Sequence, residues 1–146
     1  MITVTRATAA DAAAMATIDA VSFSEPWSER SFADALALDS YTFFRAEVEG
    51  NTVGYIGMTA VLDEADITGV AVLPSFRRRG IARRLLQRLI EESETQGLTC
   101  LHLEVREGNR AARSLYESMG FTVDGKRKQY YRFPSEDAIL MTRHRG

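Results

Sequence analysis

The chain has 146 residues, of which 45% are hydrophobic and 26% are charged, and its formal net charge is −2. This length suits one compact domain, so we expect a single domain over residues 1–146. The charge balance argues against general nucleic-acid binding, which usually needs a basic domain. One cysteine excludes an intramolecular disulfide framework.

Other patterns narrow the setting. No apolar run approaches the roughly 20 residues of a membrane span. His102 and His144 lie far apart, so no metal-ligand spacing is visible and we expect no metal. Residues 1–6 lack the charged-then-apolar layout of a signal peptide, which favours a cytoplasmic protein. The oligomeric state stays open, and a monomer is compatible with the sequence.

Periodicity predicts the elements of the first half of the chain. Residues 2–6 alternate as a strand does, and a helix is expected after the Thr8 cap. Ser28 should cap a short second helix whose apolar residues are Phe32, Leu36 and Leu38. Strands are then expected over residues 41–49, 52–62 and 65–73, the first two joined as a hairpin at Gly50-Asn51.

The second half continues the mixed pattern. A helix is predicted over residues 80–96, and a strand over 98–105 places His102 and Glu104 on one face. Asn109 opens a further helix that Gly120 ends, and a closing pair of strands spans residues 121–133 and 138–142. The order indicates one α+β (α/β) domain with a mixed sheet and helices on both faces.

The helix over residues 80–96 has its charges reversed. A helix N-terminus carries partial positive charge and favours acidic side chains, by roughly 0.3–1 kcal/mol each. Here the acidic residues lie toward the C-terminal end, and five arginines crowd the N-terminal end: Arg77, Arg78, Arg79, Arg83 and Arg84. Such a consistent exception indicates a bound anion, and phosphate is the natural one. The alternative is a solvated basic loop before an ordinary helix.

Downstream residues extend this motif. A strand, Arg-x-x-Gly-x-Ala, a helix, a strand ending Leu-Glu-Val, Asn109 and then Leu-Tyr-Glu-x-x-Gly-Phe occur in that order. This order resembles the GNAT superfamily of N-acetyltransferases. The resemblance implies a mostly antiparallel sheet and acetyl-CoA as cosubstrate, with its pyrophosphate held by the loop and its pantetheine arm along the preceding strand. The implied cofactor-binding residues are Val70, Ala71, Val72, Arg78, Arg79, Gly80, Ile81, Ala82, Arg83 and Asn109.

Two residues match the family's catalytic positions. Glu104 is the candidate general base, because the attacking amine must be neutral. Deprotonating a lysine of pKa about 10.4 costs about 4 kcal/mol near neutral pH, whereas an α-amine of pKa about 7.7–8.0 costs well under 1. A single carboxylate therefore suits an N-terminal amine better. Tyr116 is the candidate acid for the departing thiolate. The alternatives are a surface glutamate paired with arginine, a core tyrosine, and for Asn109 a helix cap alone.

Further segments resemble one GNAT family, the bacterial RimI-type enzymes that acetylate the N-terminal alanine of a small-subunit ribosomal protein. The matching segments are 25–28, 62–65, 101–106, 127–131 and 136–139. The resemblance implies a ribosomal protein N-terminus as acceptor, with Trp27 and Tyr131 lining its groove, although core packing suits Trp27 equally. An acidic stretch around Glu64 could attract a basic peptide or form a solvated turn.

Three alternatives to this function stay open. The chain could acetylate a small amine or a lysine, bind coenzyme A without catalysis, or bind nucleic acid through the arginine loop. Cys100 is expected to face the core without a partner base, so we assign it no nucleophilic role.

Overall fold

The computed structural model describes residues 1–145 and contains the predicted elements in the predicted order. Two single turns of 3-10 helix, Ala9–Asp11 and Pro74–Phe76, precede α1 and α3. The principal elements are β1 Ile2–Arg6, α1 Ala12–Ser22, α2 Glu29–Leu36, β2 Tyr41–Val48, β3 Asn51–Val61, β4 Glu64–Val72, α3 Ile81–Thr95, β5 Cys100–Arg106, α4 Arg110–Ser118, β6 Thr122–Tyr131 and β7 Glu136–His144.

One predicted boundary is wrong. Leu38 was expected on the apolar face of the second helix, but α2 ends at Leu36 and the Leu38 side chain is 54% exposed. The chain turns through residues 37–40 to enter β2, which removes Leu38 from the helical face. Phe32 and Ala35 alone supply the fully buried face of this short helix.

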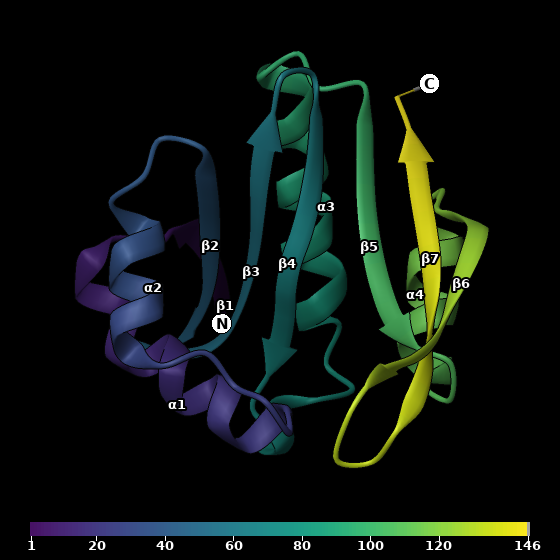
Figure 1. The fold of residues 1–146 in the computed structure, drawn as a ribbon. Helices are drawn as coiled ribbons and strands as arrows, with labels where there is room; N and C mark the ends of the chain where they lie inside the picture. Colours follow the sequence, from purple (N-terminus) through teal and green to yellow (C-terminus); the bar gives the residue numbers. More distant parts are fainter. Residues whose placement is uncertain (146) are drawn as a thin grey trace.

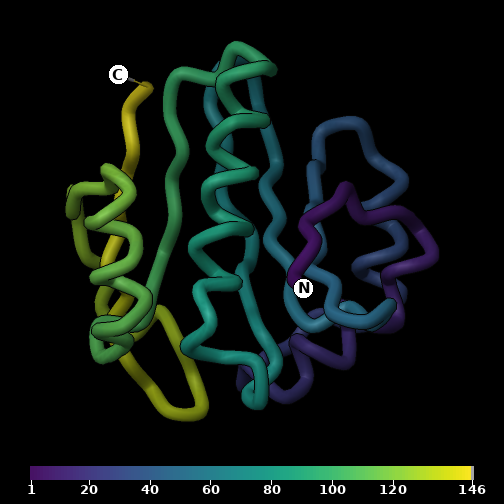
Figure 2. Tube along the Cα trace, turned by 180° about the vertical axis from the view of Figure 1, so that it is seen from behind, coloured from purple at the N-terminus to yellow at the C-terminus, as the bar shows by residue number. Residues whose placement is uncertain are grey.

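The strands form one seven-stranded sheet in the order β1-β2-β3-β4-β5-β7-β6. Every neighbouring pair is antiparallel except β4 and β5. Helices α1 and α2 cover one face and α3 and α4 the other, as Figures 1 and 2 show from opposite sides. The fold class is therefore confirmed as a mixed, mostly antiparallel sheet between helical layers.

The parallel pairing of β4 with β5 is short. Only residues 64–66 of β4 pair with residues 100–102 of β5. Beyond this point β4 stays paired with β3 as far as Val72, and β5 stays paired with β7 as far as Arg106. The two strands therefore diverge toward their C-terminal ends and leave an opening in the sheet (Figure 1).

A hydrophobic core fills each side of the sheet. Under α3, the helix residues Leu85, Leu86 and Leu89 are fully buried with Ile56 and Met58 of β3. Under α1 and α2, a second cluster centres on Met15, Ile18, Phe32, Phe43 and Tyr55. Within residues 1–145, no helix combines the length and apolar character that crossing a membrane requires.

A buried carboxylate fixes the connection between α1 and α2. Asp19 is 3% exposed, accepts a hydrogen bond from the Tyr55 hydroxyl, and accepts a second from the Trp27 backbone N–H at 2.9 Å. Burial raises the pKa of Asp19, and these two hydrogen bonds offset part of the rise. Because a buried polar group without partners is costly, the pair ties the loop before α2 to β3.

We expect Tyr55→Phe to lower the free energy of unfolding by about 1–3 kcal/mol, because Asp19 stays buried with one donor fewer. Urea unfolding followed by circular dichroism measures the change. Tyr41→Phe is the matched control, since Tyr41 lies in the same aromatic cluster and its hydroxyl has no hydrogen-bond partner among residues 1–145. An equal loss in both variants would contradict the role given to Asp19.

Candidate active site

The opening between β4 and β5 exposes backbone groups of β4. The N–H of Leu73 donates to the carbonyl of Val53 in β3, at 2.8 Å. Because N–H directions alternate along a strand, those of Val72 and Val70 point away from β3 and into the opening, whereas that of Ala71 points to β3. Two of the three predicted strand residues can therefore offer an N–H to an extended ligand.

The start of α3 lies beside this opening. Gly80 is the N-cap at φ +75° and provides no side chain to accept hydrogen bonds from the first turn. By contrast, Ser28 and Asn109 cap α2 and α4 with side-chain oxygens. Among residues 1–145, no acceptor contacts the N–H groups of residues 81–83. These donors and the positive end of the helix dipole form an anion-binding site.

The arginines divide into two groups. Arg77 donates to the Val72 carbonyl at 3.1 Å, Arg84 to the Ile2 carbonyl at 2.7 Å, and Arg83 to the Ser118 hydroxyl at 3.0 Å. These three brace the loop and α3 against neighbouring elements. Arg79 lies over the Phe76 ring, and Arg78, at φ +64°, has no hydrogen-bond or ion-pair partner within residues 1–145. A bound anion would therefore account for the positions of Arg78 and Arg79 but is not needed to explain the other three arginines.

Tyr116 lies on α4 with its ring in the core and its hydroxyl accessible. The residue is 6% exposed, and its ring packs 5.7 Å from that of Phe121. Its hydroxyl has no hydrogen-bond partner among residues 1–145, yet no fully enclosed polar side-chain atom there lacks one, so the hydroxyl must contact solvent. Burial, with a smaller contribution from the charge of Tyr131, raises the pKa of Tyr116.

Glu104 projects from the opposite face of β5. Its neighbours Leu103 and Val105 are buried under α3 and α4, whereas Glu104 is exposed. Burial raises the pKa of Tyr131 to about 12, and the negative charge of Glu104 is the next cause. Tyr131 thus lies within electrostatic reach of both Glu104 and Tyr116. The structure brings these three predicted residues to one region.

Arg106, Arg132 and Glu25 form a network of contacts, here called the clasp, that holds the β6–β7 hairpin. The sequence did not single out Arg106 as functional. Arg106 lies 4.5 Å from the centre of the Tyr131 ring and donates to the carbonyls of Arg132 and Pro134 and to the Ser24 hydroxyl. Arg132 in turn pairs with Glu25 at 2.7 Å. The clasp joins the hairpin to the α1–α2 loop. In the sequence, the only indication of this network was that Arg106 directly follows Leu-Glu-Val.

The other predicted residues lie as follows. Asn109 caps α4 by accepting from the Ala112 N–H at 3.2 Å, which confirms the cap. The Trp27 ring packs 5.1 Å from that of Phe32, in the aromatic cluster under α2. Glu64 and its acidic neighbours begin β4, at the end of the strand away from the arginine loop. Of these, only Asp63 lies in the turn, whereas Glu64 and Asp66 belong to β4, and attraction of a basic peptide stays a prediction.

The predicted orientation of Cys100 is wrong. Leu101 and Leu103 face the core, so alternation turns Cys100 to the same face as His102. Its sulfur lies 3.2 Å from Nδ1 of His144, on the neighbouring strand β7. A thiol–imidazole contact therefore exists where no partner base was expected.

Comparison with known proteins identifies the family. The sequence profile of the Acetyltransferase (GNAT) family matches residues 12–121. The chain belongs to this family. GNAT acetyltransferases take their acetyl group from acetyl-CoA, a phosphate-bearing substrate of the kind predicted for the start of α3.

Several relatives are closely similar. The [ribosomal protein bS18]-alanine N-acetyltransferase of Escherichia coli K12 is 42% identical over 118 residues, covering 80% of this chain and 79% of the relative. N-alpha-acetyltransferase RimI of Mycobacterium tuberculosis is 34% identical over 99% of this chain and 94% of its own length. The crystal structure of the E. coli ribosomal-protein-S18-alanine N-acetyltransferase superimposes with a TM-score of 0.92 at 37% identity, covering 99% of this chain and 94% of that one.

We expect the Tyr116 phenol to stay protonated in the folded protein at pH about 11, one unit above the ordinary tyrosine pKa. Near-ultraviolet phenolate absorbance should then be equal for the parent, with its five tyrosines, and for Tyr116→Phe. In urea at the same pH, the parent should show one phenolate more than the variant. A native difference of one full tyrosine would show that burial does not raise this pKa.

Proposed function

We propose that the chain transfers an acetyl group from acetyl-CoA to the N-terminal α-amine of an alanine in a ribosomal protein. The main support is the 42% sequence identity to an enzyme named for that reaction, over most of both chains. Glu104, on the exposed face of β5, and Tyr116, on α4, match the family's base and acid positions and support the proposal. A ribosomal protein substrate also implies a cytoplasmic setting.

The donor fits the opening and the arginine loop. The pyrophosphate of acetyl-CoA lies against the free N–H groups of residues 81–83, and Arg78 and Arg79 supply positive charge beside it. The pantetheine arm lies along β4 as an added strand would, bonded to the N–H groups that point into the opening. Asn109, at the start of α4, is a further contact on the β5 side.

The acetyl transfer is a direct attack. Glu104 takes a proton from the ammonium group, and the neutral nitrogen then attacks the thioester carbon. The carbonyl oxygen becomes an oxyanion, which a β4 N–H such as that of Val70 or Val72 stabilises in the opening. Collapse of the tetrahedral intermediate breaks the carbon–sulfur bond, and the nitrogen loses its remaining extra proton to solvent as the amide forms. Coenzyme A leaves as a thiolate, which the Tyr116 hydroxyl stabilises by donating a hydrogen bond.

The acceptor approaches from the face that carries Glu104. The hairpin residue Tyr131 borders this face, and the clasp of Arg106, Arg132 and Glu25 closes it toward the α1–α2 loop. Trp27 stabilises that loop from within the aromatic cluster. An α-amine is the better acceptor here, because one carboxylate has to remove a proton of pKa about 7.7–8.0 instead of about 10.4.

Two peptides of one lysine-containing sequence beginning with alanine test the proposal, one with a free N-terminus and the other with a blocked one. We expect coenzyme A release and a mass gain of one acetyl group only for the free peptide. Equal acetylation of the blocked peptide would indicate a lysine acceptor. Acetyl-CoA binding without turnover of any amine would indicate a non-catalytic module, and either result contradicts the proposal.

Glu104→Gln should lower kcat/KM for the free peptide roughly 100-fold near pH 7, because the amine loses its general base. The deficit should shrink as the pH rises above 8, where the α-amine is neutral on its own. Coenzyme A release measured across pH gives both results. Glu117→Gln, on the exposed side of α4, is the control and should match the parent. A profile of Glu104→Gln that overlies the parent's would exclude Glu104 as the base.

A further inference from the structure

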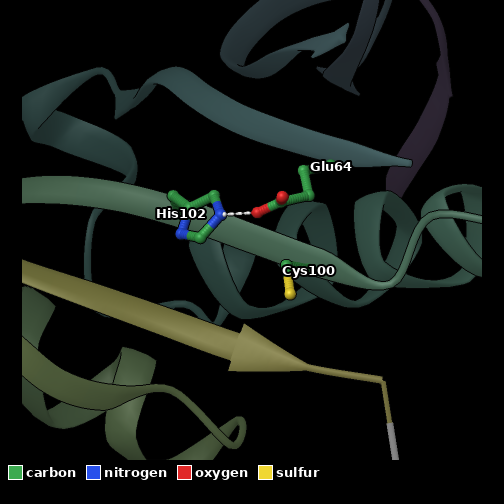
Figure 3. A group of neighbouring side chains, drawn as sticks. All are labelled: Glu64, Cys100 and His102. Atoms are coloured by element: carbon green, nitrogen blue, oxygen red, sulfur yellow. Dashed lines mark hydrogen bonds and ion pairs between the residues drawn. The ribbon is translucent and has the colours of Figure 1, made fainter. Parts of the chain in front are cut away.

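Side chains that commonly bind metal ions gather at the end of the sheet where β4 and β5 pair. A carboxylate oxygen of Glu64, the sulfur of Cys100 and a ring nitrogen of His102 all lie within 4.8 Å of one another (Figure 3). Nδ1 of His144 lies 3.2 Å from the same sulfur. We propose that these four side chains bind a zinc ion.

The strand register explains why residues so distant in sequence meet. Glu64 of β4 pairs with Cys100 of β5, and Cys100 pairs with His144 of β7, so the three form one row across three strands. Directly opposed residues on one face have Cβ atoms about 4.5–5.5 Å apart. His102 follows two residues after Cys100 and therefore points to the same face.

The His102 ring is oriented by a chain of hydrogen bonds. The Thr142 hydroxyl donates its one hydrogen to Asp124, so its contact with His102 Nδ1 at 2.9 Å is one in which it accepts. Nδ1 therefore donates to Thr142, and Nε2 faces Glu64 at 2.6 Å. Metal-binding histidines are typically held in this way through their other nitrogen. The 2.6 Å contact is a direct hydrogen bond between the ring and the carboxylate, and an ion that binds both groups would replace it.

The donor set fits zinc best. Imidazole, thiolate and carboxylate groups are the usual Zn²⁺ ligands, whereas Ca²⁺ and Mg²⁺ prefer oxygen alone. One thiolate and one carboxylate balance the two charges of the ion. Tetrahedral coordination needs ligand atoms roughly 3.3–3.8 Å apart. Binding would therefore move Glu64 away from Nε2 of His102 and bring His144 toward the group formed by Glu64, Cys100 and His102. Asp63 and Asp66 border the same surface hollow as Glu64 and His102 and add negative potential.

The site would stabilise the paired end of the sheet. Its ligands come from β4, β5 and β7, and β4 and β5 are otherwise joined only along residues 64–66 and 100–102. A bound ion would join all three strands at the end opposite the acetyl-CoA opening. An ion that binds the folded chain alone raises its stability by mass action. The zinc proposal does not depend on which amine the protein acetylates.

Cobalt titration of the full, untagged and reduced chain tests the site. Co²⁺ bound by a thiolate absorbs in the near ultraviolet, and Cys100 is the only thiol in the chain. We expect the band to saturate at one Co²⁺ per chain and to disappear when Zn²⁺ is added. Zn²⁺ should also raise the Tm of the parent but not that of Cys100→Ser.

Variants separate the four-ligand site from binding by the thiol alone. Glu64→Gln and His102→Gln should weaken Zn²⁺ binding at least 10-fold, and Thr142→Val should weaken it about 10- to 100-fold by releasing the His102 ring. Glu91→Gln, on the exposed face of α3, is the matched control and should bind as the parent does. No thiolate band in the parent, or unchanged Zn²⁺ affinity in Glu64→Gln and His102→Gln, would overturn the proposal.

Discussion

The short parallel pairing of β4 with β5 determines where the functional groups of this protein lie. Each strand is held along its length by an antiparallel neighbour, β3 for one and β7 for the other, so the two can separate without losing the sheet. Backbone groups of β4 are then left without a strand partner, and such groups need one. An extended substrate that supplies hydrogen bonds can take this place, which makes the divergence itself a binding site.

Where β4 and β5 diverge, side chains from the helices behind the sheet and from its front face can approach the same substrate. Tyr116 belongs to α4 behind the sheet, whereas Glu104 projects from the front of β5. In a continuous sheet the two side chains would be separated by a layer of backbone. The negative charge of Glu104 contributes, after burial, to the raised pKa of Tyr131, and the charge of Tyr131 contributes in the same way to that of Tyr116.

The sequence predicted elements and faces well and lateral neighbours poorly. Periodicity reports which side of a strand is buried, so the strands, the helices and the exposed position of Glu104 were all predictable. It does not report which strand lies alongside. β7 lies between β5 and β6, and this order brings His144 beside Cys100 and Thr142 beside His102, which no spacing in the sequence indicates. The divergence of β4 from β5 and the clasp of Arg106 were missed for the same reason. The charge pattern predicted an anion at the start of α3, but it could not distinguish the arginines that hydrogen-bond to neighbouring elements from Arg78, which has no such bond within residues 1–145.

The environment of Tyr116 changes what this residue can contribute. An ordinary phenol of pKa about 10 is a weaker acid than a thiol, whose pKa is near 8.5 in cysteine, so proton transfer from it to a thiolate is already unfavourable by about 1.5 pKa units. Burial raises the pKa of Tyr116, so full transfer is less favourable while hydrogen-bond donation stays available over the whole physiological range. A thiolate formed in the same opening is also removed from water, which raises the pKa of its thiol and narrows the difference. In the proposed reaction, Tyr116 would therefore stabilise the leaving thiolate as its charge develops, and would complete proton transfer only after the carbon–sulfur bond has broken.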